Sequence, residues 1–120
     1  MSYELSELST YSYESNSYKR IPGTDDWVEA AKLGDQGGYE WTDFNAYYSP
    51  SARRYFWHGD SGCSCNSWND DISSAADFEN GSRDDLLRAW DAFAKENQYA
   101  IPTTDYIDGV ATIKTFKEPR

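Results

Sequence analysis

The most regular alternation of apolar and polar positions lies in residues 82–96, and it predicts a helix. Its apolar side chains recur at helical spacing and form a single stripe, made of Leu86, Leu87, Trp90, Phe93 and Ala94. Ser82 and Asp85 have the spacing of an N-terminal capping box. Opposite charges four residues apart follow on the remaining surface. These features together indicate one long amphipathic helix.

Two aromatic-rich runs predict a β-hairpin. Residues 39–48 and 53–58 flank the turn-forming tetrapeptide Ser-Pro-Ser-Ala at 49–52. Within the first run the large side chains change phase between Trp41 and Phe44, which predicts a β-bulge there. In the second run, Tyr55 and Trp57 are expected on one face, and Phe56 and His58 on the other.

The remaining elements are expected to complete a small antiparallel sheet. Residues 26–33 are interpreted as a strand that ends at the Gly-rich connector 34–38, and residues 106–116 as a last strand. Residues 59–80, which are rich in Gly, Ser, Asn and Asp, are interpreted as an irregular loop. The predicted fold class is α+β, with a sheet of three to four strands and one long amphipathic helix packed on a face.

The first 20 residues differ in composition from the rest of the chain. They are rich in Ser, Tyr and Glu and carry few aliphatic side chains that could pack. Pro22 and Gly23 then mark a turn. The expected organisation is a flexible N-terminal tail at 1–20 and a single domain at 21–120.

Composition changes this picture in two ways. The aliphatic content is low, but ten Tyr and five Trp supply large rings, so the core is expected to be built from aromatic side chains. The formal net charge is −10, which disfavours direct nucleic-acid binding because duplex binding relies on clustered Lys and Arg. Without an 18-residue apolar run or a signal-like N-terminus, the chain is expected to be cytoplasmic, with no membrane partner.

The candidate metal-ligating or redox residues are His58, Cys63 and Cys65. A zinc site would need about four ligands, and the Cys-x-Cys spacing is shorter than that of a zinc knuckle. A disulfide between the two cysteines would close a small, easily reduced ring. A third interpretation is that the thiols simply pack as small buried side chains.

The candidate binding surface is acidic and aromatic. No Lys or Arg occurs between Arg54 and Arg83, whereas carboxylates and large rings accumulate there. The residues expected to form the surface are Trp57, Asp60, Trp68, Asp70, Asp71, Asp77, Phe78 and Glu79. Such a surface suits contact with a basic protein patch, with the rings as anchors. The alternative is a solvated loop that keeps the protein soluble.

The hairpin, the following loop and the helix resemble a group of small acidic proteins encoded by actinobacteriophages and some actinobacteria. The resemblance covers about residues 27–90, and its most specific element is Asp-Ser-Gly-Cys-Ser-Cys at 60–65. The group's pattern has Pro after the second Cys, where this chain has Asn66, so the match is partial. The resemblance implies a cytoplasmic phage-type protein and transfers no catalytic residue.

These observations favour a non-enzymatic binding protein whose partner is a host or phage protein. DNA mimicry is a narrower version of that hypothesis, because the net charge could imitate a short duplex segment. The alternatives are a small metal-binding or redox module centred on the Cys-x-Cys loop, or a minor virion component. An enzyme is not expected, because the chain has a single His and neither a phosphate-binding Gly loop nor a placed carboxylate pair.

Overall fold

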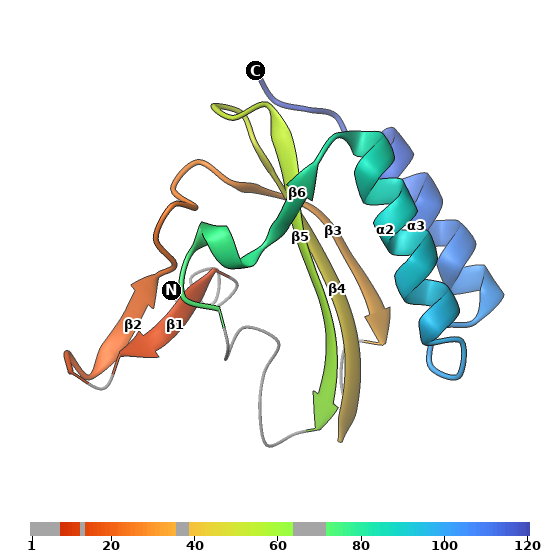
Figure 1. The fold of residues 1–120 in the computed structure, drawn as a ribbon, viewed down its shortest axis with the longest axis horizontal. Coiled ribbons are helices and arrows are strands. Elements are labelled where there is room, and N and C mark those ends of the chain that lie inside the picture. Colours follow the sequence, from red (N-terminus) through yellow and green to blue (C-terminus); the bar gives the residue numbers. More distant parts are fainter. Residues whose placement is uncertain (1–7, 13, 36–38, 64–71) are drawn as a thin grey trace.

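The structure is a computed structural model that describes residues 8–12, 14–35, 39–63 and 72–120. It contains a two-stranded and a four-stranded antiparallel sheet, with two helices beside the larger sheet (Figure 1). The strands are β1 (Ser9–Ser12), β2 (Ser17–Arg20), β3 (Val28–Asp35), β4 (Glu40–Ser49), β5 (Arg54–Cys63) and β6 (Glu79–Gly81). The helices are the 3-10 helix η1 (Ala75–Asp77), α2 (Arg83–Glu96) and α3 (Thr103–Thr115).

The predicted hairpin is confirmed and forms the centre of the larger sheet. The strand order is β3-β4-β5-β6, and β4 pairs with β5 in unbroken register from Glu40↔Cys63 to Ser49↔Arg54. The strand expected at residues 26–33 is also confirmed, as β3. The predicted bulge is wrong in its position, because the register shift lies on β3, between Glu29 and Ala31.

The phase change in β4 has another cause, which is burial on both faces. Every β4 residue after Glu40 is buried. Phe44, Ala46 and Tyr48 belong to a core cluster shared with the helices, whereas Trp41 and Tyr47 belong to a second cluster on the opposite face. A strand buried on both faces carries apolar residues in both phases, so no inserted residue is needed to explain the pattern.

The prediction of a single long helix and a last strand is wrong. Residues 103–115 form α3, so two helices of 14 and 13 residues lie side by side (Figure 1). Gly109 of α3 allows the close approach, since a Cβ there would lie 2.6 Å from Nε1 of Trp90 on α2. The same Trp90 nitrogen donates to the carbonyl oxygen of Tyr106 at 3.1 Å.

The interpretation of residues 59–80 as an irregular loop is wrong in part. β5 continues to Cys63, and η1 and β6 occupy much of the end of this stretch. Ser74 and Asp77 form a capping box that begins η1. Residues 64–71 lie outside the described part.

The N-terminal stretch contains the small β1–β2 sheet, which is followed by a turn. Leu8 and Ile21 are buried in the second core cluster, and the Ile21 N–H donates to the Leu8 carbonyl oxygen at 2.7 Å. The division of the chain into a tail at 1–20 and a domain at 21–120 stays a prediction. Within the described residues, no helix is both long enough and apolar enough to cross a membrane.

Arg83 ties the C-terminal end of α3 to the start of α2. Its guanidinium donates to the carbonyl oxygens of Ile113 and Phe116, at 2.6 and 2.9 Å, and to the Glu118 carboxylate at 3.0 Å. Tyr55 of β5 donates to the same carboxylate at 2.6 Å. The chain after α3 is thereby fixed against the sheet.

Candidate functional site

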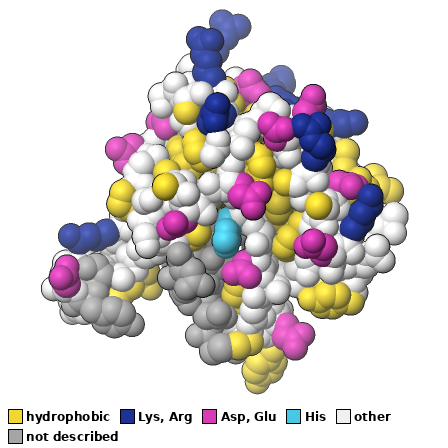
Figure 2. Space-filling model, in the orientation of Figure 1, with side chains coloured by type: hydrophobic (Ala, Val, Ile, Leu, Met, Phe, Trp, Pro, Cys, Tyr) yellow, Lys and Arg dark blue, Asp and Glu magenta, His cyan; other side chains and the backbone are white. Residues whose placement is uncertain are grey.

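Three of the predicted surface carboxylates lie along the β5–β6 edge of the larger sheet, and we call this side of the molecule the acidic face. It consists of Asp60 on β5, Asp77 on η1 and Glu79 on β6. Figure 2 shows the single histidine of the chain in the middle of this view, with acidic side chains around it. Nε2 of His58 lies 3.8 Å from the Asp60 carboxylate. This face therefore presents negative charge beside one titratable imidazole.

The local fold explains how the acidic face is assembled. Antiparallel pairing places Glu79 opposite Trp57, and both side chains therefore point toward the helices. Asp60 points to the opposite face of the sheet, because successive strand residues alternate. Asp77 accepts from the Ser73 N–H at 2.7 Å, so its carboxylate also stabilises the start of η1.

Two of the three predicted aromatic anchors are buried. Trp57 is 5% exposed and packs in the cluster shared with the helices, whereas Phe78 is 4% exposed and packs in the second cluster. Trp68, Asp70 and Asp71 lie outside the described residues. Large rings that are exposed, Tyr39 and Tyr99, come from other segments. The acidic part of the predicted surface is thus brought together without two of its rings.

The predicted metal ligands are not brought together where the structure describes them. His58 and Cys63 are five residues apart on β5, which separates them by about 17 Å along the strand. They also point to opposite faces. Cys63 is disulfide-bonded, and Cys65 lies outside the described residues. Within the described part, no group of three or more His, Cys, Asp or Glu side chains is placed to hold a metal ion.

The open cavity beside Cys63 is lined by residues from both central strands. Its volume is about 660 Å³, and Trp41, Cys63 and Tyr99 contribute to its wall. Nε1 of Trp41 donates to the Cys63 carbonyl oxygen at 2.7 Å, which fixes the end of β5 against β4. The cavity gives solvent access to the cysteine end of the hairpin.

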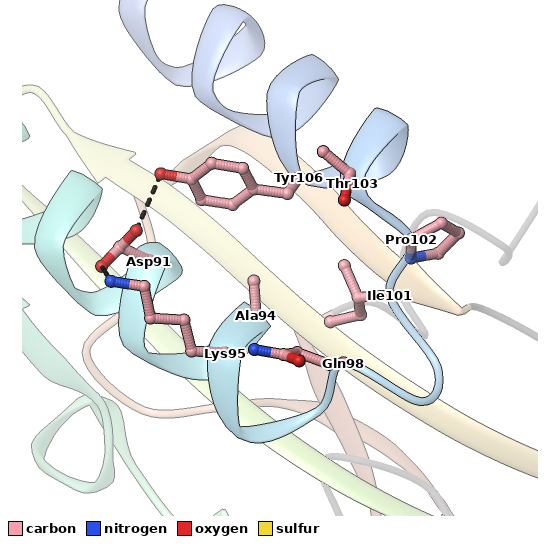
Figure 3. Close-up of a pocket in the computed structure, with 8 residues that line it drawn as sticks. All are labelled: Asp91, Ala94, Lys95, Gln98, Ile101, Pro102, Thr103 and Tyr106. Atoms are coloured by element: carbon pink, nitrogen blue, oxygen red, sulfur yellow. Dashed lines mark hydrogen bonds and ion pairs between the residues drawn. The ribbon is translucent and has the colours of Figure 1, made fainter.

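A further cavity, of about 360 Å³, lies between α2 and α3 and has no counterpart among the predicted sites (Figure 3). In its wall, Tyr106 donates to Asp91 at 2.7 Å, and Lys95 forms an ion pair with the same carboxylate at 3.0 Å. The sequence predicts a strand at residues 106–116, and a strand there would not form this cavity with α2. The spacing of Tyr106, Val110 and Ile113, which places all three on one helical face, could have indicated it.

The electrostatics of this cavity favour a cross-link between the helices over a reactive centre. The hydrogen bond to Asp91 raises the pKa of Tyr106, and the hydrogen bonds from Tyr106 and then Lys95 lower the pKa of Asp91. The hydrogen bond from Lys95 to Asp91 raises the pKa of Lys95. Each group is thus held in its ordinary protonation state at neutral pH. A phenol and an ammonium group held this way are poor nucleophiles and poor bases.

Comparison with known proteins identifies a family. Residues 27–113 match the family model of a domain of unknown function, DUF7574. The matched range contains β3 to β6, α2 and most of α3, and therefore includes the acidic face and the cavity between the helices. No curated protein and no solved structure matches the chain.

Proposed function

We propose that this chain, which belongs to the DUF7574 family, is a non-enzymatic protein-binding domain that docks its acidic face on a basic segment of a partner protein. The observation that carries the proposal is the charge pattern. The chain has no Lys or Arg from residue 55 to residue 82, and Asp60, Asp77 and Glu79 from that stretch all lie along the β5–β6 edge of the larger sheet.

We expect this charge to affect how fast a partner protein is encountered, and which partner is bound, more than how tightly it is bound. Complementary charge accelerates the encounter of two proteins, and it disfavours partners of like charge. The Debye length is about 8 Å at physiological ionic strength, so exposed carboxylates attract a basic segment only at short range. Binding by the acidic face should therefore weaken as salt is added.

The class of partner follows from the sequence resemblance and from charge. The resemblance to phage-type acidic proteins makes host or phage proteins the first to test. Among these, proteins with exposed Lys-rich or Arg-rich segments match the net charge of −10. The mutually paired Asp91, Lys95 and Tyr106 also support a binding role over an enzymatic one, because they leave the cavity between the helices without an activated group.

A lysine-rich peptide titrated at rising salt tests the proposal. The Asp60→Asn/Glu79→Gln double variant should bind about fivefold more weakly than the unchanged chain, as expected for the loss of about 1 kcal/mol of exposed charge attraction. The matched control, Glu29→Gln/Asp108→Asn, removes the same charge from exposed positions on β3 and α3 and should change affinity less than about twofold. The proposal would be contradicted if the two double variants weakened binding equally, or if the affinity did not change with salt concentration.

A second candidate is a thiol–disulfide module, and the disulfide of Cys63 is the observation that favours it. Cys63 is exposed and lines the open cavity near Tyr99, so a small thiol could reach it. Equilibration of the protein in glutathione buffers would give its reduction potential. A potential near that of the glutathione pool supports a redox module, whereas a far more negative value makes the disulfide structural.

A further inference from the structure

Among the described strands, only β6 pairs with the outer edge of β5, and it does so along only part of the length of β5. On its inner edge β5 pairs with β4 at ten positions, whereas on its outer edge β6 pairs only with Tyr55, Phe56 and Trp57. In Figure 1, β6 runs beside one part of β5, and β5 continues well beyond it. No other described strand pairs with this side of β5. Residues 59–62 therefore form what we call the open edge.

Of the devices that commonly prevent another strand from pairing, the open edge carries one charged side chain, Asp60, which disfavours an acidic strand but attracts a basic one. Natural edge strands are commonly protected by Lys, Pro or a bulge. Residues 59–62 are Gly-Asp-Ser-Gly, and the register with β4 is unbroken along them. One backbone group is already satisfied locally, because the Ser61 N–H donates to the Asp60 carboxylate at 2.8 Å. The carbonyl oxygen of an added strand could accept from the Ser61 N–H instead, which would release the Asp60 carboxylate.

A small cavity adjoins the open edge on the side of the helices. Its volume is about 230 Å³, and it lies where β6 begins and α2 passes over β5. The residues that define it are Phe44, Trp57, Gly59, Glu79, Phe93 and Glu96. Gly59 brings the Phe93 ring against the strand, since a Cβ at this position would lie 2.7 Å from Phe93 Cδ1.

The chemistry of this cavity fits a long basic side chain. Among the described residues that line it are two carboxylates, from Glu79 and Glu96, together with aromatic and alanine side chains, and no Lys or Arg. The aliphatic stem of a Lys or Arg can lie along the rings while its charged end meets the carboxylates. On the opposite face of the sheet the open edge is flanked by Asp60. Side chains on both faces of an added strand would thus meet negative charge.

We infer that the open edge binds an extended basic segment of the partner protein as an additional β-strand, with a Lys or Arg side chain in the cavity beside Glu79 and Glu96. This inference rests on the proposed function and names the mode of binding. A second copy of this chain is a poor occupant, because each copy carries a formal charge of −10 and the two open edges would bring Asp60 of each copy together.

The test uses two peptides of equal charge and the full chain. One peptide is a Lys-Thr repeat of about six residues, a typical strand length. The other is a Lys-Pro repeat, which is a poor β-strand because Pro fixes φ near −65° and removes every second N–H. Hydrogen exchange reports on the amides of residues 59–62. We expect the Lys-Thr peptide to slow their exchange and to bind at least about tenfold more tightly than the Lys-Pro peptide.

A pair of variants locates the site. Glu79→Lys places a positive charge in the cavity wall and should weaken binding of the Lys-Thr peptide about tenfold. Glu29→Lys makes the same change on β3, at the opposite edge of the sheet, and should weaken it no more than about twofold. Equal weakening by the two variants would overturn the assignment of the cavity.

The other outcomes separate the two proposals. If both peptides bind with equal, salt-dependent affinity and exchange at 59–62 is unchanged, strand addition is wrong while the acidic face remains a binding surface. If neither peptide binds at low salt, the proposed function fails as well. If exchange at 59–62 slows with rising protein concentration in the absence of peptide, a second copy occupies the edge and the inferred partner is wrong.

Discussion

Glu118 shows how a single exposed carboxylate can fix the end of the chain. It accepts from Tyr55 and from Arg83, and these hydrogen bonds lower its pKa below the ordinary value. Burial, with the hydrogen bond to Glu118, raises the pKa of Tyr55, so the phenol keeps the proton that it donates. The contact therefore depends on Glu118 being ionised and Tyr55 being neutral.

The sign of the pH dependence follows from the lowered pKa of Glu118. A carboxylate with a lower pKa in the folded state contributes stability that is complete above its unfolded value, near 4.5, and is lost as the pH falls toward the folded value. We predict that Glu118→Gln lowers the free energy of unfolding by about 1 kcal/mol at pH 7. In urea titrations this difference should shrink below about pH 4, and a difference that grows on acidification would contradict the assignment.

Individual residues also show what sequence could not reveal. The carboxylates of the acidic face were predictable, because a run without Lys or Arg stays negative in any fold. The burial of Trp57 and Phe78 was not, since a large ring serves equally well as a core residue and as a contact anchor. In a chain with few aliphatic residues, the rings are needed inside.

At the scale of elements, α2 was predictable and α3 was not. The amphipathic stripe and the capping box of α2 agree with each other, and the structure confirms both. The α3 segment has four β-branched residues near its end, and its N-cap residue, Pro102, supplies no side-chain hydrogen bond. The intrinsic propensities of these residues favour a strand, but the segment packs against Trp90 as a helix.

Gly109 tests the packing of α2 on α3. Replacing Gly by Ala inside a helix normally gains about 1 kcal/mol. Here the added Cβ would lie 2.6–2.8 Å from atoms of the Trp90 ring, so we predict that Gly109→Ala destabilises the fold by about 1–2 kcal/mol. The neighbouring Ala111→Gly, at an exposed position, should cost about 1 kcal/mol through helix propensity alone. Stabilisation by Gly109→Ala, measured in urea, would show that the helices are not this close.

Arg83 tests the anchoring of the end of α3. Met retains the aliphatic stem but loses the donors to the carbonyl oxygens of Ile113 and Phe116, so Arg83→Met should cost about 2 kcal/mol. Hydrogen exchange should accelerate in the last turn of α3 before it does elsewhere. The control, Arg88→Met, removes an exposed ion pair with Asp85 on the same helix and should cost less than about 0.5 kcal/mol. An unchanged exchange rate in α3 would contradict the anchoring role.

For the whole molecule, the net charge of −10 opposes compaction by self-repulsion. The structure contains a few exposed ion pairs among its described residues, and such pairs contribute little stability. We therefore predict that raising sodium chloride from low concentration to about 0.5 M increases the melting temperature at pH 7, because screening relieves the repulsion. A fall in melting temperature would mean that the ion pairs outweigh the repulsion.

The central claim is that one face of this acidic molecule, not its net charge, selects a basic partner. The most direct measurement is an amide chemical-shift map of the full chain titrated with the Lys-Thr peptide at physiological salt. We expect shifts concentrated at residues 59–62, at Glu79 and around Glu96, with β3 and the exposed side of α3 unaffected. Shifts spread evenly over every acidic segment, including Glu29 and Asp108, would contradict it.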